Sequence, residues 1–476
     1  DTDRSRGLGD VYKRQDYISK APLEVKCIFF FKEAVLMTPA AIREQFFSVL
    51  NDTEKNISAF VKNPGSDMSR HRACSFSDTV NATLCFGMNR TNTELLNFFG
   101  LTRKTVPSKS AFSQQRKKLN SCLFPHLLRS FNNAIPMTKT YNGFHLAAVD
   151  GSDLNLPTDK NDSVYRVKHS SGDNCYFQMH VNALYDICEN RYISAVTQPR
   201  PKMNEPRAFC QMIDECPMPD NTIFIADRGY MTMNTLAQLI GHNKFFLIRA
   251  KSPSYSSSLL NPLMKENVES DSRLTIGITR SHKKLYMENP SAYKILDHRS
   301  VFDFIPPDDH ESVYSMSIRC TCVELEPGSY EYLVSNLPDN LFSAEDLKQL
   351  YWKRWSVETS FRSLKYALSL AYLHSVNREL IIQEVFAKLI MYNFASLLHA
   401  YASAAKEALN RCAKTKYRYK VSFDDVVPIA RELIKQPSED EKIKALLLRH
   451  LTAVKMIKSS ARRIKSQTVK PLNNRA

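Results

Sequence analysis

The sequence lacks the cysteine patterns that mark zinc sites and disulfide frameworks. Its eleven cysteines are an odd number, with no C-x-x-C pair and no Cys/His spacing suited to zinc. A long uninterrupted apolar run is also missing. The most apolar stretch, 386–405, contains Lys388, Asn393 and His399, which favours a buried helix over a membrane span. No signal peptide and no internal repeat are evident. We therefore expect a cytoplasmic protein with reduced thiols and no membrane contact.

Positive charge is what the sequence has in excess. Its 476 residues include 65 Lys and Arg against 49 Asp and Glu, a net charge of +16. Such an excess raises the rate of encounter and the affinity with polyanions. Many basic proteins are merely soluble, so the charge alone does not establish a partner. Nucleic acid is the first partner to consider.

A helix-turn-helix pattern lies in the first third of the chain. Residues 93–99 and 109–119 have helical spacing, and Gly100 and Pro107 mark the loop between them. A basic second helix of this kind suits a DNA groove or the phosphate backbone, although a solvated surface helix explains it equally well. The residues that we expect to contact DNA are Arg116, Lys117 and Lys118.

From residue 145 the pattern changes to short apolar runs bounded by turn residues. Strands are predicted over 145–149, 176–187, 191–196, 222–226 and 244–250, and helices over 206–215 and 231–240. This βββαβαβ order predicts a mixed five-stranded sheet flanked by helices, an α/β (α+β mixed) fold class. Residues 252–341 add β-like segments, among them a hairpin around Pro327-Gly328, and predict an inserted strand-rich module.

Two aspartates occupy matching positions at predicted strand ends. Asp150 ends the run 146–149 and precedes Gly151, while Asp227 ends the run 223–226. A single Asp at a strand end is usually a turn or cap residue. Two such residues on neighbouring strands instead predict a shared site.

Carboxylates that meet at one edge of a sheet suit metal-assisted phosphodiester chemistry. Two metal ions roughly 4 Å apart stabilise the attacking and the leaving oxygen together. Mg²⁺ prefers oxygen ligands, and Mn²⁺ is an acceptable substitute. A third acid would complete the set.

A predicted helix that begins at Ser343 carries the best candidate for that acid. At about 100° per residue, Tyr351, Arg354, Glu358 and Lys365 fall within an arc of roughly 60°. The cations and the phenol suit phosphate, and the glutamate suits a metal ion. A solvated face with Arg354 and Glu358 as an i,i+4 ion pair is the competing interpretation.

These residues resemble the IS4-type bacterial insertion-sequence transposases of the DDE group. The spacing Y-x2-R-x3-E-x6-K is the signature of that family, and all four positions are present here. The segments A-V-D-G-S around Asp150 and A-D-R-G-Y around Asp227 are also similar to family blocks, and the resemblance covers about residues 70 to 400. It implies an RNase H-like core with two Mg²⁺ ions held by the catalytic acids. Those acids would be Asp150, Asp227 and Glu358, with Tyr351, Arg354 and Lys365 binding DNA phosphates.

The resemblance also implies an activity and its partners. Such an enzyme cleaves transposon ends and joins their 3'-hydroxyls to target DNA. Its partners are double-stranded inverted-repeat ends, target DNA and a second copy of itself in a synaptic dimer, in the nucleoid-containing cytoplasm of a bacterium. One departure concerns hairpin formation, for which some relatives use a Trp in the insertion. The tryptophans here are Trp352 and Trp355, and Tyr286, Phe302 and Phe304 are each better explained as core aromatics.

Pattern and resemblance together divide the chain into six parts. The divisions are 1–36, an uncertain leader whose first fifteen residues look non-native; 37–140, a helical DNA-binding region; 141–251, the first part of the catalytic core; 252–341, the β-rich insertion; 342–400, the second part of the core; and 401–476, a basic helical region.

Two other functions fit the same residues. One is a metal-dependent nuclease of the same fold that cuts DNA without joining strands. The other is a non-catalytic DNA-binding protein that descends from a transposase. The presence of all three acids argues against the second, because a protein that only binds DNA has no physical need for a set of metal ligands.

Overall fold

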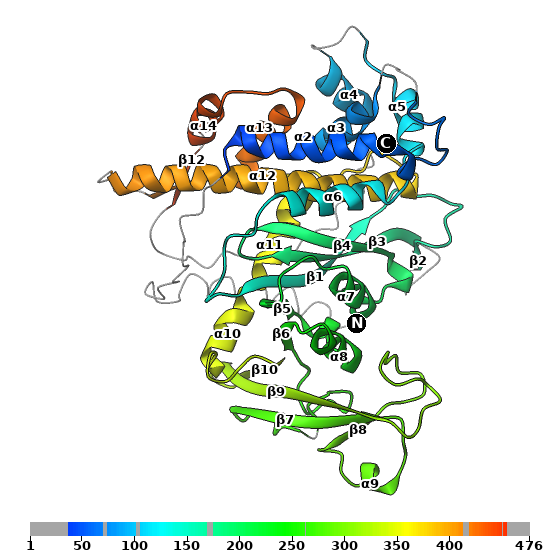
Figure 1. The fold of residues 1–476 in the computed structure, drawn as a ribbon, viewed down its shortest axis with the longest axis vertical. Helices are drawn as coiled ribbons and strands as arrows, with labels where there is room; N and C mark the ends of the chain where they lie inside the picture. The colour runs from blue at the N-terminus through cyan, green and yellow to red at the C-terminus, as the bar shows by residue number, and fades with distance from the viewer. Residues whose placement is uncertain are drawn as a thin grey trace.

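The computed structural model describes residues 37–69, 74–100, 105–168, 175–261, 263–412, 418–449 and 451–454. The expected leader, residues 1–36, lies outside this part of the chain, as do the basic residues beyond 454. The described residues form a mixed α/β structure in which helices cover both faces of a large sheet (Figure 1).

The described residues before the first strand form helices. These are α2 (Pro39–Lys55), the 3₁₀ turn η1 (Ile57–Ala59), α3 (Phe76–Cys85), α4 (Thr91–Phe99), α5 (Lys109–Lys117) and α6 (Leu123–Ala134). Helix α5 begins where expected because the Ser108 side chain accepts the backbone N–H of Ala111. Helices α4 and α5 are the two that the sequence predicts on either side of the 100–107 loop.

Arg116, on α5, is buried rather than presented to DNA. Its side chain is 2% exposed, and its guanidinium donates to Gln383 Oε1 at 3.2 Å, Glu384 Oε1 at 3.0 Å and the Leu380 carbonyl at 2.6 Å. All three acceptors belong to α12 (Arg378–Cys412). This burial corrects the expectation that Arg116 contacts DNA, because internal acceptors already take up its donors.

The two basic neighbours of Arg116 have different surroundings. Lys117 is exposed and Lys118 is half-buried. Successive residues on a helix point about 100° apart, so one residue of a basic run can face the core while the next faces solvent. Contact of Lys117 and Lys118 with DNA stays a prediction.

One continuous sheet organises the middle of the chain. Its strands are β1 (His145–Asn155), β2 (Arg166–Lys168), β3 (Cys175–Asp186), β4 (Arg191–Pro199), β5 (Thr222–Ala226), β6 (Phe245–Arg249), β7 (Ser270–Thr279), β8 (Tyr293–Ile295), β9 (Val313–Glu326) and β10 (Ser329–Ser335). The order is β2-β3-β1-β5-β6-β10-β9-β7-β8, with β4 also paired to β3. Strand β3 runs antiparallel to both of its neighbours, β1 and β4, whereas β5 and β6 run parallel to β1.

The strands of the expected insertion extend this sheet instead of forming a separate one. β10 pairs antiparallel with β6, from Leu333 opposite Arg249 to Ser335 opposite Leu247, and then with β9. The predicted β9–β10 hairpin is present, and Gly328 in its turn has a φ of +80°. The five-stranded sheet predicted from the sequence is therefore only one part of a larger sheet.

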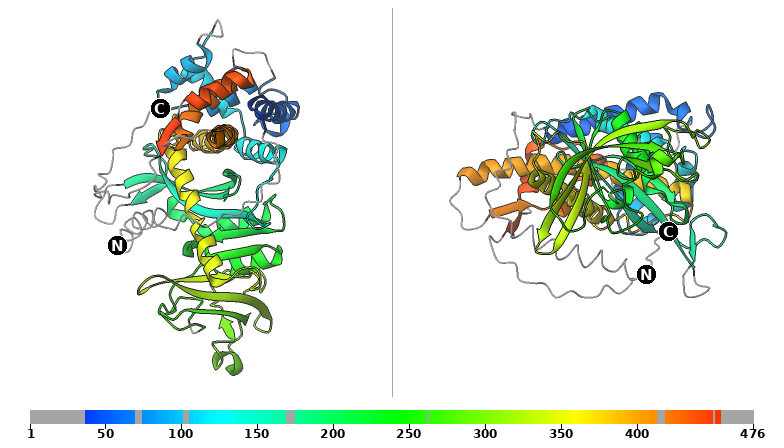
Figure 2. Two further views of the ribbon diagram at one scale, coloured as in Figure 1. Left: turned by 90° about the vertical axis from the view of Figure 1, so that its left-hand side faces the viewer. Right: turned by 90° about the horizontal axis from the view of Figure 1, so that it is seen from below.

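The remaining elements connect and cover the strands. They are η2 (Arg200–Lys202), α7 (Glu205–Asp214), η3 (Arg228–Tyr230), α8 (Met233–Gly241), α9 (Lys284–Met287), α10 (Ala344–Trp352), α11 (Trp355–Lys365), α12, β11 (Arg418–Val421), α13 (Phe423–Lys435), α14 (Asp440–Arg449) and β12 (Leu451–Val454). Figure 2 shows α10 and α11 in yellow, running along one side of the sheet towards α12.

Side chains alternate along the strands, so the two faces of the sheet pack against different helices. Val149 and Phe224 pack with residues of α7 and α8, whereas Leu146 and Ile225, an odd number of positions away along their strands, pack with α10. This is the period of two that a strand buried on both faces requires. Asp150 is four positions, an even number, after Leu146 on β1, so both side chains point to the same face of the sheet.

Helix α12 is the longest apolar element, and it lies inside the protein. Residues 378–407 are long and apolar enough to cross a membrane, but 89% of their most apolar window is buried. Figure 1 shows α12 between helices α2 and α3 on one side and the sheet on the other. The interpretation as a buried helix therefore fits the structure. Nine cysteines in the described part of the chain, from Cys74 to Cys322, are free.

Candidate active site

Asp150 lies within β1, not at its end. Strand β1 continues to Asn155 and pairs Asp150 with Ala183 of β3, whereas its pairing with β5 stops at Val149 and Ala226. The predicted strand end at Val149 is thus wrong for one edge of β1 and right for the other. The sequence does not predict the continuation of β1 to Asn155, because the residues that pair with β3 beyond Val149 are mostly polar and show no apolar pattern.

Asp227 follows the last residue of β5 directly and begins the η3 turn. Both aspartates therefore lie where the parallel pair β1–β5 ends. Because the two strands run in the same direction, their carboxyl ends meet at one edge of the sheet.

The helix predicted to carry the third acid is divided in two. Helix α10 ends at Trp352 and α11 begins at Trp355. Around this junction the N–H groups of four residues bond to the carbonyl three residues earlier, at 3.0 to 3.1 Å: Lys353, Arg354, Ser356 and Val357. Such 3₁₀-type bonds tighten the helix locally and alter the rotation between residues. The single continuous helix of the sequence-based prediction is corrected accordingly.

The guanidinium of Arg354 lies among the three acids. Its Nη2 lies 2.8 Å from Glu358 Oε1, and its Nη1 lies 3.7 Å from Asp150 Oδ2. The Arg354 side chain is 4% exposed, against 20% for Asp150 and 28% for Glu358. Burial acts to lower the pKa of Arg354, but Tyr351 and the three acids, Asp227 included, raise it well above its ordinary value. Arg354 is therefore the cation that balances this group of carboxylates.

Asp227 has two further partners. The Tyr351 hydroxyl donates to Asp227 Oδ1 at 3.1 Å, and Arg249 Nη1 lies 3.7 Å from the same oxygen. Arg249 Nε in turn lies 3.3 Å from Glu331 Oε1. Burial alone would raise the pKa of Asp227, but Arg354, Arg249 and hydrogen bonds hold it below its ordinary value. Asp227 is thus ionised within its surroundings.

Asp150 is the acid whose ionisation the surroundings oppose. Burial raises the pKa of Asp150 to about 7; Arg354 opposes this rise, and Glu358 and Asp227 add to it. Burial also raises the pKa of Glu358, with Arg354 again opposing. A carboxyl with a raised pKa gains more from an added cation than one that is already well solvated.

Lys365, the last member of the signature, reaches β1 beyond Asp150. Its Nζ donates to the Asp153 carbonyl at 2.8 Å, and burial lowers its pKa. The structure therefore brings Asp150, Asp227 and all four signature residues together at one edge of the sheet. Tyr351 and Arg354 contact carboxylates there, and their contact with DNA stays a prediction.

The three acids supply the type of ligand atom, carboxylate oxygen, that a hard metal ion prefers. Within the described ranges, no three Asp, Glu, His or Cys side chains are grouped closely enough to hold a metal ion as they stand. Carboxylate oxygens are nevertheless the donors that Mg²⁺ prefers. Because the Arg354 guanidinium lies among the acids, a metal ion bound there would have to take its place.

Several polar residues near the site were missed from the sequence. Arg249 ends the strand next to Asp227, so a cation at the end of a predicted strand was the available signal. His180, on β3, lies 2.7 Å from Asp153 and 3.2 Å from Glu205. A lone histidine in an apolar strand gives no such signal, because its partners come from distant elements.

The aromatic residues considered for a flipped base pack against other rings of the segment 252–341. Phe302 is 4% exposed and packs in the core, and Phe304 is 37% exposed with Tyr314 at 4.9 Å between ring centroids. Tyr286, on α9, lies 4.7 Å from Tyr293. Each ring thus has aromatic neighbours of its own.

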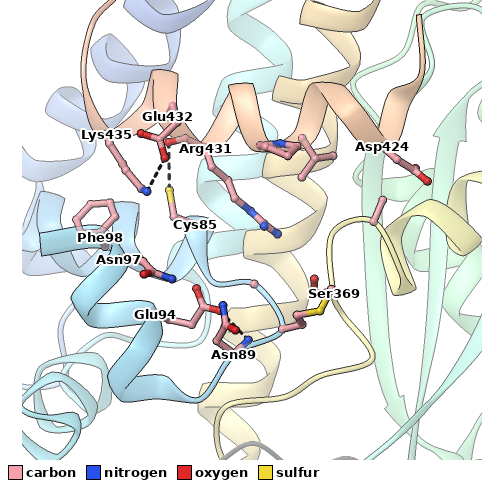
Figure 3. Close-up of a pocket in the computed structure, with 15 residues that line it drawn as sticks. Cys85, Asn89, Glu94, Asn97, Phe98, Ser369, Asp424, Arg431, Glu432 and Lys435 are labelled. Atoms are coloured by element: carbon pink, nitrogen blue, oxygen red, sulfur yellow. Dashed lines mark hydrogen bonds and ion pairs between the residues drawn. The ribbon is translucent and has the colours of Figure 1, made fainter. Parts of the chain in front are cut away.

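A separate cavity lies between the N-terminal helices and α13. Figure 3 shows Glu94 and Cys85 on one side of it, with Arg431, Glu432 and Lys435 on the other. Both signs of charge line the cavity, and none of the predicted site residues does. It therefore offers no selective surface for phosphate.

Comparison with known proteins identifies the family. A family model described as a transposase DDE domain matches residues 143–394, a segment that contains all three acids. Among solved structures, the chain is similar to the cryo-EM structure of a piggyBac transposase synaptic complex with hairpin DNA. That likeness, at 10% identity and a TM-score of 0.43 over 91% of this chain and 88% of that chain, is too distant to carry a conclusion. No match was found among curated proteins. Since the family model covers more than half of the 476 residues, the chain belongs to the transposase DDE domain family: it is a DNA transposase, a metal-dependent enzyme that cuts and transfers DNA.

Proposed function

We propose that Asp150, Asp227 and Glu358 are the catalytic acids of this transposase and that they hold two Mg²⁺ ions, for which Mn²⁺ is a substitute. The observation that carries the proposal is the position of Arg354, whose guanidinium lies 2.8 Å from Glu358 and 3.7 Å from Asp150. Acids from β1, from the end of β5 and from α11 thus share one cation. The group retains negative charge for metal ions, because Arg354 serves all three carboxylates and the second cation, Arg249, is shared between Asp227 and Glu331.

The bound metal supplies stabilisation of the attacking and leaving oxygens of the phosphodiester. The residues of the chain do the rest. Tyr351, Arg354 and Lys365 bind phosphates of the transposon end, since an arginine fork, an ammonium and a phenol are suited to phosphate oxygens. On binding DNA, Arg354 would exchange its carboxylate partners for phosphate, and Asp150, Asp227 and Glu358 would then be the residues available to hold the metal.

The subgroup is IS4-type and the core is RNase H-like. The complete Y-x2-R-x3-E-x6-K signature supports the subgroup. The strand order β4-β3-β1-β5-β6 supports the core, with three antiparallel strands followed by two that are parallel to the first. Acids placed on β1 and after β5 then lie on the central strands.

The proposed reaction cuts at inverted-repeat ends and joins the freed 3'-hydroxyls to target DNA. A dimer in a bacterial cytoplasm would hold two ends. The exposed Lys117 and the half-buried Lys118 support a DNA-contacting role for α5. Neutralising phosphates with these lysines makes the affinity for DNA fall with salt.

Cleavage by variants tests the proposal. The substrate is a duplex that carries the inverted repeats found by sequencing the DNA next to the gene. Asp150→Ala, Asp227→Ala and Glu358→Gln are expected to abolish Mg²⁺-dependent cleavage, while Asp214→Asn, on the exposed end of α7, retains it. Cleavage by any of the three acid variants at the wild-type rate would contradict the assignment.

Strand transfer separates the proposal from a nuclease of the same fold. Pre-cut ends with free 3'-hydroxyls are mixed with a target plasmid and Mg²⁺. Joined products are expected with the wild type and absent with Glu358→Gln. Cleavage without any joining would instead support the nuclease, and DNA binding without metal binding would support a non-catalytic descendant.

A further inference from the structure

A chain of polar contacts lies behind the first aspartate. His180 of β3 is paired in register with Asp153 of β1, and its Nδ1 lies 2.7 Å from Asp153 Oδ1. Its Nε2 lies 3.2 Å from Glu205 Oε1, at the first turn of α7, and Arg200 Nε donates to Asp153 Oδ2 at 3.0 Å. Side chains alternate along a strand, so Asp153 and Asp150 point to opposite faces of β1. These residues therefore support the site without facing the metal ligands.

Glu205 fills the space over two glycines that follow the aspartates. A Cβ added at Gly229, two residues after Asp227, would lie 2.6 Å from Glu205 Oε2. A Cβ added at Gly151, the residue after Asp150, would lie 3.1 Å from Glu205 Oε1 and 2.3 Å from His180 Nε2. One carboxylate thus touches the turn after β5 and the middle of β1 together.

A second tie joins the same two segments. The Tyr230 hydroxyl, in η3, donates to Asn182 Oδ1 at 2.8 Å, and Asn182 is the register partner of Gly151. Tyr230 is 2% exposed and packs edge-on against Phe209 of α7, with 5.8 Å between ring centroids. Two successive turns of helix α7 therefore contact the η3 segment: the first through Glu205 and the second through Phe209.

We propose that His180 and Glu205 are positioning residues that hold Asp150 and Asp227 at a fixed separation. A movement of the Glu205 carboxylate is passed to Gly151 and Gly229, and so to both neighbouring aspartates. The link to metal binding rests on the proposed function of those aspartates, whereas the fixed separation does not.

The charges of the cluster favour a rigid arrangement. Burial alone would lower the pKa of His180, but its hydrogen bond with Asp153 and the nearby Glu205 carboxylate raise it to about 9. The imidazolium therefore lies between two carboxylates at neutral pH, and charge-assisted contacts of this kind are roughly twice as strong as neutral ones.

Hydrogen exchange of the metal-free full-length protein tests the positioning directly. In His180→Gln and Glu205→Ala, the amides of Tyr230, the last residue of η3, and of Met231, which caps it, are expected to exchange about tenfold faster than in the wild type. The matched control is His242→Gln. His242 pairs with Asp214 at 3.0 Å at the other end of α7, and it is exposed. Unchanged exchange in η3 in both variants, or equal acceleration by the control, would overturn the proposal.

A double-mutant cycle with Mn²⁺ as the probe tests the consequence for metal binding. Gly229→Ala and Glu205→Ala are each expected to weaken Mn²⁺ binding by roughly 10- to 100-fold, as changes behind a metal site do. The Gly229→Ala/Glu205→Ala protein is expected to bind no more weakly than Glu205→Ala, because removing the carboxylate removes the clash. If the loss of Mn²⁺ affinity in the double variant equalled the product of the two single losses, the proposal would be overturned.

The two measurements separate this proposal from the assignment of the acids. Equal Mn²⁺ binding by the wild type and Asp150→Ala would refute Asp150 as a metal ligand. The exchange rates of the η3 amides would still decide whether His180 and Glu205 fix the two segments. Thermal unfolding of each variant confirms that it is folded before either measurement.

Discussion

Replacement of Arg116 by methionine is expected to destabilise the contact between α5 and α12 without a direct effect on DNA contacts. Methionine keeps much of the length of arginine but donates no hydrogen bond. The Arg116 side chain is 2% exposed, and it donates to Gln383, Glu384 and the Leu380 carbonyl. Its removal takes the arginine counter-ion away from the buried Glu384 carboxylate, which keeps His374 Nδ1 at 3.2 Å.

The magnitude follows from these contacts. One hydrogen bond to a charged group contributes about 1.5–3 kcal/mol, and two to neutral groups contribute about 0.5–1.5 kcal/mol each. The total agrees with the roughly 3–5 kcal/mol that breaking a buried ion pair costs. Glu384 Oε2 keeps the backbone N–H of His374 at 3.0 Å, which favours the lower half of that range. We therefore expect a loss of about 3 kcal/mol in the free energy of unfolding.

Thermal unfolding measures this loss. An unfolding entropy of about 2.1 cal/mol/K per residue gives roughly 1 kcal/mol/K for a chain of this length, so the midpoint is expected to fall by about 3 °C. Lys117→Met on the same helix is the matched control, since Lys117 is exposed. It is expected to leave the midpoint unchanged and to weaken DNA binding with a smaller salt slope.

Opposite outcomes for the two variants would refute this reasoning. A stable Arg116→Met protein with weakened DNA binding would place Arg116 on the DNA surface, as the sequence alone suggested. A destabilised Lys117→Met protein would show that α5 packs through a different face.

Three further predictions concern the acids. Arg354→Gln is expected to lower the free energy of unfolding of the metal-free protein by about 2–3 kcal/mol. Mn²⁺ should raise the unfolding midpoint of this variant more than that of the wild type, because the ion no longer has to replace the guanidinium. An equal rise would contradict this exchange. Because burial raises the pKa of Asp150 to about 7, the folded protein binds the extra proton and loses stability as pH rises from about 4 to 7. Asp150→Asn should therefore exceed the metal-free wild type by about 2–4 kcal/mol at pH 8 and by little at pH 4; a difference independent of pH would refute the raised pKa. Tyr351→Phe, which removes the donor to Asp227, should cost about 1–2 kcal/mol, whereas Tyr366→Phe, at 63% exposure, should cost nothing measurable.

The sequence predicted best those elements that local pattern defines. The strand 222–226 was predicted with the bounds of β5, because an apolar run between turn residues marks a buried strand. The positions of Asp150 and Asp227 near the ends of paired strands followed from the same pattern. Both depend only on neighbouring residues.

Pairing between distant segments escaped prediction. The sheet continues from β6 into β10 through residues more than 80 positions apart, such as Arg249 and Leu333. Nothing in either segment specifies that partner. The burial of Arg116 was missed for the same reason, since its acceptors lie on α12, more than 260 positions away.

The candidate site was predicted in its members but not in their contacts. Helical spacing placed Tyr351, Arg354, Glu358 and Lys365 on one face, yet the 3₁₀-type bonds between α10 and α11 depend on packing against the sheet. Helical spacing also gave no indication that Arg354 lies among the acids. That contact requires β1, which is 200 positions earlier in the chain.

Iron-mediated cleavage of the protein itself tests the central claim most directly. Fe²⁺ bound in place of Mg²⁺ generates hydroxyl radicals with ascorbate and peroxide, and these cut the backbone near the metal. The assignment predicts cuts beside Asp150, Asp227 and Glu358 in the same protein, suppressed by excess Mg²⁺ and lost in Glu358→Gln. Cuts confined to other segments, or unchanged cuts in Glu358→Gln, would contradict a metal site built from these three acids.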